Sequence, residues 1–332
     1  MNATGLQKIL KLHKYVVPTK TPAPILRHVL ILPDKIISTD LAWRLETPCI
    51  VPGVPKAGIL IEHAEFLRAA NFVEGEVHFG APKEPSNSDH LDLYGDGAVV
   101  NVYRQNVQNS NFPNAPKAKG DLLPANGLIE AFSAVADFAD PTHDWEVMHH
   151  VEIKDGVAVG MNGSIFKTVK TNAPNVVIPA DKIQLLKAFE PSHIGENYFV
   201  SPLGKLYFKP LDREFPKWQV NAKKGEYLGK LVLDKKLIAR IEKLRMLLND
   251  RFARVKLVLD GGFKLETETA SLDLGGEASV EFSAWQTFSL LQKILDDIKA
   301  SEAKFYRSEK DIVTLLETDD ALYGIARRND KD

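Results

Sequence analysis

Residues 6–39, LQKILKLHKYVVPTKTPAPILRHVLILPDKIIST, contain the pattern that decides the fold. Apolar residues first recur at helical spacing, as far as Val17. Pro18 and the prolines that follow it then prevent a longer helix. Two short apolar runs come next, on either side of the turn Pro33-Asp34. The stretch therefore predicts an amphipathic helix followed by a hairpin of two strands.

The same unit occurs twice more along the chain. Residues 128–159 hold a helical apolar stripe and then a hairpin around Asp155-Gly156. This dipeptide is typical of a type I′ turn, because both of its central residues need positive φ. Residues 237–269 hold a third helical stripe and two alternating runs around Asp260-Gly261. The repetition indicates a duplicated domain.

A second unit lies between these copies: a short apolar strand, a breaker and a helix, at residues 58–72, 176–189 and 278–298. Equivalent helices recur roughly every 105–120 residues, which is close to a third of the chain. We therefore expect an α+β protein with two helices and antiparallel sheets in each of three tandem domains. The expected domains are 1–119, 120–225 and 226–332, although length alone favours two.

The expected connections between domains are loop-like. Residues 109–120 are rich in Asn and Pro, and residues 222–226 are short and charged.

Composition excludes several classes of protein. The chain has 332 residues, 42 Lys plus Arg and 44 Asp plus Glu, so its net charge of −2 excludes a uniformly basic nucleic-acid-binding protein. Cys49 is the only cysteine, which excludes an intramolecular disulfide and a thiolate zinc site, and we expect it to be buried. No signal-peptide core, membrane span, P-loop or dinucleotide-binding motif is present. We expect a cytoplasmic protein without a cofactor or a membrane partner.

Basic side chains lie on the polar faces of the predicted helices. The candidate DNA-binding residues are Lys8, Lys11, Lys14, Arg68, Lys182, Lys187, Lys236, Arg240, Lys243 and Lys293. Such faces attract phosphates through counterion release, and no spacing for base reading accompanies them. Ordinary solvation also places lysines on helix surfaces, and the helix at 128–139 carries no basic residue, so this alternative stays open.

Short motifs, in order and spacing along nearly the whole chain, resemble the bacterial DNA polymerase III β-subunit family, the sliding clamps. Pro24-Ile25-Leu26 is similar to the family's Pro-Ile-Leu at the start of a strand, and Ser38-Thr39-Asp40-Leu41 to its Ala-Thr-Asp-Leu. Phe112-Pro113 is similar to the Phe-Pro motif that closes its first domain. The segment 212–220, DREFPKWQV, resembles the Asp-Gly-Arg-Phe-Pro-Asp-Tyr segment that closes its second.

The resemblance implies the DNA-clamp fold and a non-enzymatic processivity factor of DNA replication. Two protomers would close head to tail into a homodimer ring of six domains, with the helices facing duplex DNA. The ring would slide while it tethers a DNA polymerase, so its contacts with double-stranded DNA need only be weak and independent of sequence. Such a protein is expected in the cytoplasm, associated with the nucleoid, or in the host cytoplasm if a phage encodes it.

The resemblance also implies a pocket into which the DNA polymerase and the clamp loader insert a short apolar peptide. Its residues in this chain would be Met148, Met161, Gly163, Ile165, Phe166, Pro216, Val220, Tyr323 and Ile325. The chain departs from the family here, because residues 160–166, GMNGSIF, stand where the family has Ala-Thr-Asp-Gly-His-Arg-Leu. The C-terminal residues 323–332 also differ from the family's Met-Pro-Met-Arg-Leu ending. We expect a divergent member, with a phage or another mobile element as one candidate source.

Two other interpretations stay open. The first is a metal-dependent hydrolase that uses the cluster at 140–150, namely Asp140, His143, Asp144, His149 and His150. In a strand, however, neighbouring histidines point to opposite faces and do not easily share one ion. The second is a repeat-built scaffold that binds other proteins and never binds DNA.

Overall fold

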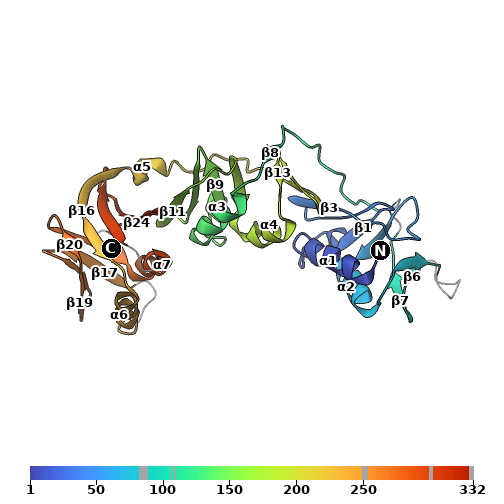
Figure 1. The fold of residues 1–332 in the computed structure, drawn as a ribbon, viewed down its shortest axis with the longest axis horizontal. Coiled ribbons are helices and arrows are strands. Elements are labelled where there is room, and N and C mark those ends of the chain that lie inside the picture. The colour runs from blue at the N-terminus through green and yellow to red at the C-terminus, as the bar shows by residue number, and fades with distance from the viewer. Residues whose placement is uncertain (82–88, 106, 108–109, 249–252, 299–301, 329–332) are drawn as a thin grey trace. The chain divides into compact units, whose positions relative to one another are not determined.

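The computed structural model describes residues 1–81, 89–105, 107, 110–248, 253–298 and 302–328 (Figure 1). These residues form seven α-helices and antiparallel sheets, which confirms the predicted α+β class. The chain divides into two compact units, residues 1–129 with 182–210, and residues 130–181 with 211–332. The three domain ranges expected from the repeats stay a prediction.

The first unit contains an eight-stranded antiparallel sheet in the order β4-β1-β2-β3-β15-β14-β13-β8. Its strands are β1 (His28–Ile31), β2 (Lys35–Thr39), β3 (Trp43–Pro48), β4 (Ile59–Glu62), β8 (Leu123–Pro124), β13 (His193–Ile194), β14 (Tyr198–Ser201) and β15 (Gly204–Phe208). A second sheet joins β5 (His78–Gly80), β6 (His90–Gly95) and β7 (Ala98–Tyr103). Strand β15 pairs with β3 in the register Lys205 to Glu46, so one sheet joins both stretches of the unit.

Three helices accompany these sheets: α1 (Ala3–His13), α2 (His63–Phe72) and α4 (Ile183–Phe189). Helix α1 begins at Asn2, whose side-chain oxygen accepts a hydrogen bond of 2.7 Å from the Gly5 amide. It contacts both α2 and α4. Helix α1 ends at His13, whereas the sequence predicts a helix as far as Val17. The chain turns at residues 14–17, because a residue that precedes a proline disfavours helical backbone.

The second unit contains a nine-stranded antiparallel sheet in the order β12-β9-β10-β11-β24-β23-β22-β16-β20. Its strands are β9 (His150–Lys154), β10 (Val157–Met161), β11 (Ile165–Lys170), β12 (Val176–Pro179), β16 (Lys224–Val232), β20 (Glu277–Ala278), β22 (Glu302–Ser308), β23 (Val313–Glu317) and β24 (Ala321–Ala326). The pairing of β11 with β24 in this unit matches that of β3 with β15 in the first. Residues 222–226 are mostly strand rather than the predicted loop, because β16 pairs with β22 from Lys224 onward.

A four-stranded sheet in the same unit has the order β19-β18-β17-β21. Its strands are β17 (Arg254–Leu259), β18 (Phe263–Glu266), β19 (Ser271–Gly275) and β21 (Phe282–Thr287). The unit also holds α5 (Gln219–Ala222), α6 (Lys235–Arg245) and α7 (Phe288–Ile298), while α3 (Leu128–Val135) crosses the division between the units.

The last predicted helix begins later than expected. Residues 283–287 belong to β21 rather than to a helix, because β21 pairs with β17 along its whole length. Trp285, expected in a buried helical stripe, is therefore a half-buried strand residue opposite Lys256. The pairing between distant segments overrides the local helical pattern, which continues correctly from Phe288.

Candidate functional site

The exposed face of α1 carries three of the candidate cations. Lys8, Lys11 and Lys14 are exposed, while Leu6 and Leu10 on the other face of the helix are fully buried. None of the three lysines has an ion-pair partner among the residues that the structure describes. Their charges are therefore available to a ligand.

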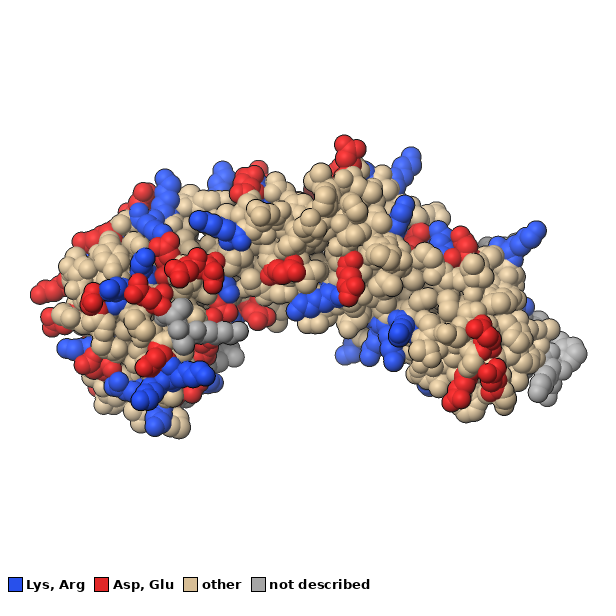
Figure 2. Space-filling model, in the orientation of Figure 1, with Lys and Arg blue, Asp and Glu red and all other residues tan. Residues whose placement is uncertain are grey.

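The other candidates of the first unit lie on the two helices that contact α1. Arg68 on α2 and Lys187 on α4 are exposed. Lys182, just before α4, is half-buried, and its Nζ lies 3.8 Å from Oδ2 of Asp40. Figure 2 shows Lys and Arg side chains over α1 and α4. The structure thus brings most of these cations together on one group of helices.

In the second unit the cations gather on α6. Lys236, Arg240 and Lys243 are exposed and share one face of the helix, as their spacing predicts. Leu237 and Leu244 are buried on the opposite face. Figure 2 shows Lys and Arg side chains clustered over α6. Helix α6 therefore presents a basic surface on an apolar base.

Lys293 on α7 differs from the others. Its Nζ donates a hydrogen bond to the backbone oxygen of Asp137 and lies 5.3 Å from the centre of the Phe138 ring. This lysine is partly buried and is already bound within the protein. We expect it to contribute less to any external contact than the residues of α6 do.

Two buried histidines lie beneath the basic face of α1. His13 contacts the Ser38 hydroxyl at 2.7 Å, and His63 contacts the Leu10 backbone oxygen at 2.7 Å. Burial, together with the neighbouring His63, lowers the pKa of His13 to about 3. Burial also lowers the pKa of His63. Both imidazoles are neutral at physiological pH, and they link α1 to β2 and α2 without adding charge.

The histidine cluster at 140–150 uses its imidazoles in backbone contacts. The sequence predicts a strand over residues 147–153, but residues 146–149 form a 3-10 turn and strand β9 begins only at His150. His149 contacts the backbone oxygen of His143 at 2.6 Å, and His150 contacts that of Glu146 at 3.0 Å. Within the described ranges, no group of three or more His, Cys, Asp or Glu residues could hold a metal ion. The hydrolase interpretation has no support from this geometry.

The predicted partner pocket divides between the two faces of the sheet at the β11–β24 junction. Met148, Met161 and Phe166 belong to one buried cluster, in which Phe215 also packs. Gly163 lies at its edge: a Cβ built on this residue would stand 3.9 Å from Cε of Met148. The remaining members of this face, Pro216 and Val220, are half-buried and flank Trp218, which packs against the same cluster.

Three of the nine predicted residues lie on the opposite face. Ile165, Tyr323 and Ile325 pack in the large core that includes α6 and α7. The Tyr323 hydroxyl contacts Oδ2 of Asp297 at 2.7 Å. Side chains alternate along a strand, so Ile165 and Phe166 cannot face the same pocket. The structure therefore does not bring these three together with Met148 and Phe166.

Sequence reasoning did not assign a role to Phe215 and Trp218. Phe215 is buried against the Met148 and Phe166 side of the sheet, and the Trp218 ring centre lies 6.4 Å from that of Phe166. Their large aromatic side chains, in a mostly polar segment, were the sequence signal that could have indicated packing against the sheet.

Cys49 is buried, as predicted, and burial raises the pKa of its thiol to about 11. Among the helices that the structure describes, none is long and apolar enough to cross a membrane.

No family model matches the sequence, and no curated protein matches it. Solved structures, in contrast, match along its whole length. The DNA polymerase III subunit beta from Pseudomonas aeruginosa is 15% identical, with a TM-score of 0.79 over 99% of each chain. A putative DNA polymerase III beta subunit from Eubacterium rectale is 16% identical, with a TM-score of 0.80 over 100% of this chain and 98% of that one.

The beta clamp of Helicobacter pylori, crystallised bound to a DNA ligase peptide, is 13% identical, with a TM-score of 0.75 over 99% of each chain. The chain therefore has the fold of the DNA polymerase III beta sliding clamps from end to end. The resemblance indicated by the short motifs is confirmed at the level of the fold.

Proposed function

We propose that this protein is a DNA sliding clamp, a ring-shaped processivity factor that encircles duplex DNA and tethers the replicative polymerase. The observation that carries the proposal is the set of exposed cations on α1 and α6, which have no ion-pair partner within the described ranges. In a chain with a net charge of −2, these cations are concentrated on the helices of a clamp fold. The function is non-catalytic: the protein positions an enzyme on DNA.

The cations act on the phosphate backbone. Exposed Lys and Arg neutralise phosphates and release counterions, a contact that carries no sequence information. Weak contacts of this kind allow a closed ring to slide, because retention depends on encirclement and not on affinity. Lys182 and Lys293, which already contact Asp40 and Asp137, contribute less than the free cations of α1 and α6.

The ring forms from two protomers that associate head to tail. Such a heterologous interface closes when the rotation between successive protomers is 180°. Each protomer supplies three repeats, so six repeats surround the DNA. The expected mass in solution is twice that of a 36.9 kDa chain.

Partners dock on the Phe166 face of the β11–β24 junction. Met148, Met161 and Phe166 supply an apolar base, and Gly163 forms its edge. The polymerase and the clamp loader insert a short apolar peptide there. The peptide complex of the Helicobacter pylori clamp supports this mode of binding.

Charge reversal tests the DNA contact directly. The variant K8E/K11E/K236E/R240E changes two cations on α1 and two on α6. We expect its affinity for primed duplex DNA, measured by fluorescence anisotropy, to fall at least tenfold, and the salt dependence to become shallower.

The matched control reverses four exposed lysines outside the helices, in K56E/K154E/K170E/K310E. It makes the same change in net charge and is expected to retain most of the affinity. Equal affinity of the two variants would contradict DNA binding by the helices and favour the scaffold interpretation.

A further inference from the structure

Residues 110–119 form a strap of chain beside the β3–β15 junction of the first unit. These residues hold no helix or strand, and the side chains of Arg44 and Asn197 bind their backbone. Arg44 Nη1 donates a hydrogen bond of 2.7 Å to the Pro113 oxygen. The Asn197 side chain donates to the Lys117 oxygen at 3.0 Å and accepts from the Lys119 amide at 2.9 Å. The strap is therefore held at Pro113 and again at Lys117 and Lys119.

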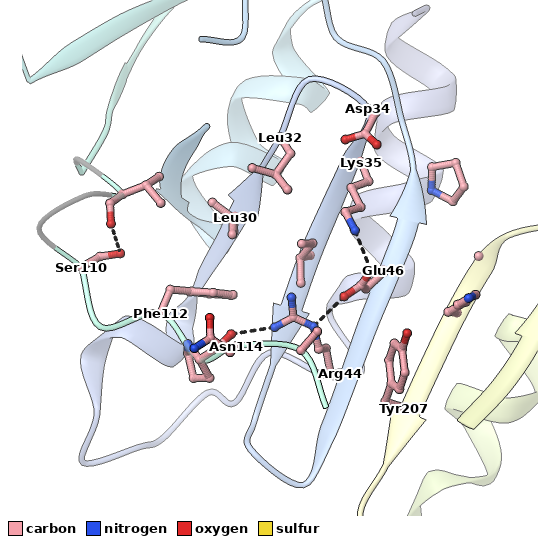
Figure 3. Close-up of a pocket in the computed structure, with 17 residues that line it drawn as sticks. Leu30, Leu32, Asp34, Lys35, Arg44, Glu46, Ser110, Phe112, Asn114 and Tyr207 are labelled. Carbon is pink, nitrogen blue, oxygen red and sulfur yellow. Dashed lines mark hydrogen bonds and ion pairs between the residues drawn. The ribbon is translucent and has the colours of Figure 1, made fainter. Parts of the chain in front are cut away.

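Two cavities adjoin this strap. The larger, of about 790 Å³, lies among β1, β2, β3, β15 and the strap (Figure 3). The smaller has a volume of about 420 Å³. Arg44, Pro113, Asn114 and Tyr207 line both cavities, so the two are neighbours. Volumes of this size accept large side chains of a ligand.

The larger cavity has an apolar wall. Leu30 and Ile37 are buried in one cluster, against which the half-buried Phe112 packs. In Figure 3, Leu30 and Phe112 lie on one side of Arg44, and Tyr207 lies on its other side. An apolar side chain that entered here would remove this surface from water.

The rim of the two cavities has an excess of positive charge. Six cations and only two carboxylates line them. One of these carboxylates, Glu46, is already shared by Lys35 at 2.9 Å and Arg44 at 2.8 Å. The exposed cations at the rim have no acidic partner among the described residues, namely Lys117, Lys119, Lys205 and Lys209. The rim is therefore complementary to an anionic ligand.

The β11–β24 junction of the second unit differs from the β3–β15 junction in the aromatic side chains that pack against the sheet. There the equivalent Phe-Pro segment buries Phe215 and packs Trp218 against the sheet. At the β3–β15 junction the strap contributes only the half-buried Phe112, and a cavity remains. The two junctions therefore differ in the aromatic side chains that the segment packs against the sheet: Phe215 and Trp218 at one, and Phe112 alone at the other.

We propose that the β3–β15 junction binds an extended acidic peptide of a partner protein. One large apolar side chain of the peptide enters the cavity beside Leu30 and Phe112, and its flanking carboxylates contact Lys117, Lys119 and Lys209. A peptide fits better than a nucleic acid, because the apolar wall formed by Leu30, Ile37 and Phe112 can bury an apolar side chain while the cationic rim binds the flanking carboxylates. The site is distinct from the basic faces of α1 and α6 and from the Phe166 face of the β11–β24 junction. It does not depend on encirclement of DNA.

Fluorescence anisotropy of the full-length protein tests the site with the labelled peptide Gly-Glu-Asp-Phe-Asp-Glu-Gly. We expect saturable binding that weakens at least tenfold when Phe in the peptide is replaced by Ala. The variant K117E/K119E/K209E is expected to weaken binding at least tenfold, whereas the control K56E/K154E/K170E leaves it unchanged. No saturation below about 1 mM, or equal binding to both variants, would overturn the proposal.

A second variant tests the cavity without a change of charge. Ala115 is exposed and lines the larger cavity, so we expect the side chain of Ala115→Trp to occupy the cavity without disturbing the buried core. We expect the same tenfold loss of peptide binding, and an unchanged affinity would overturn the assignment of the cavity.

Two further measurements separate this site from the others. Displacement of the peptide by an equimolar octathymidine would show a nucleic-acid site and would also overturn the proposal. The variant K8E/K11E/K236E/R240E, in contrast, is expected to bind the peptide normally, so failure of the clamp function and failure of this site give different results.

Discussion

The ring of Phe166 occupies the space where a side chain on Gly324 would stand. A Cβ built on Gly324 would lie 2.1 Å from Cε1 of Phe166, on the neighbouring strand of the β11–β24 pair. The absence of a side chain at 324 therefore determines where the Phe166 ring lies. Through that ring, it shapes the apolar base on which we propose that partner peptides dock.

Gly324→Ala is expected to destabilise the protein by about 1–3 kcal/mol, because the added methyl forces the Phe166 ring out of its place. Chemical denaturation measures this loss. Phe166→Leu in the same background leaves room for the methyl, so the double variant should lose less stability than the sum of the two single variants. Additive losses would show that the two residues do not constrain each other.

Peptide binding should distinguish the two faces of the β11–β24 junction. Phe166→Ala is expected to weaken binding of a partner-derived apolar peptide at least tenfold, because it removes the apolar base. Tyr323→Phe removes only a hydroxyl that contacts Asp297 on the opposite face, so it should leave peptide binding unchanged. Isothermal titration measures both affinities. A comparable loss in Tyr323→Phe would place the site on the other face.

The two kinds of basic residue should behave differently when they are neutralised. Lys236→Ala, on the exposed face of α6, is expected to weaken DNA binding and to leave the melting temperature nearly unchanged. Lys293→Ala should lower the melting temperature and leave DNA binding nearly unchanged, because the Lys293 Nζ already contacts the Asp137 oxygen and the Phe138 ring. Anisotropy with primed DNA and thermal denaturation give the two readings. If Lys293→Ala weakened DNA binding more than Lys236→Ala, the assignment of free and bound cations would be wrong.

Acidification should destabilise the first unit through His13. Its pKa is about 3 in the folded protein against 6.5 when it is unperturbed, so below pH 6.5 the unfolded chain binds a proton that the folded chain does not. Stability therefore falls as the pH decreases from 6.5 toward 3, by about 2 kcal/mol at pH 5. His63, whose pKa is also lowered, acts in the same direction.

Urea denaturation at pH 7 and pH 5 measures this effect. His13→Gln should reduce the difference in stability between the two pH values, whereas His193→Gln, at an exposed position, should not. Equal differences in the wild type and in His13→Gln would contradict the role of His13.

Much of the fold could be predicted from the sequence because local patterns agree with it. The helical spacing of Leu6 and Leu10, the turn at Asp155-Gly156 and the i, i+4, i+7 cations of α6 each depend on a few neighbouring residues. The start of α7 could not be predicted in this way, because residues 283–287 are held in β21 by pairing with the distant strand β17.

The site shows the same limit. That Lys236 and Arg240 are exposed follows from helical periodicity alone. The division of the predicted pocket between two faces follows from strand alternation at Ile165 and Phe166, a signal that the sequence carries and that the family resemblance obscured. The cavity under the strap could not be inferred at all, because it depends on how residues 110–119 lie across strands that are distant in sequence.

Electron cryo-microscopy of the purified protein tests the central claim most directly. The account predicts a closed ring of two protomers with a central hole wide enough for duplex DNA, lined by α1, α2, α6 and their neighbouring helices. A monomer, or a dimer whose basic helices face outward, would contradict it.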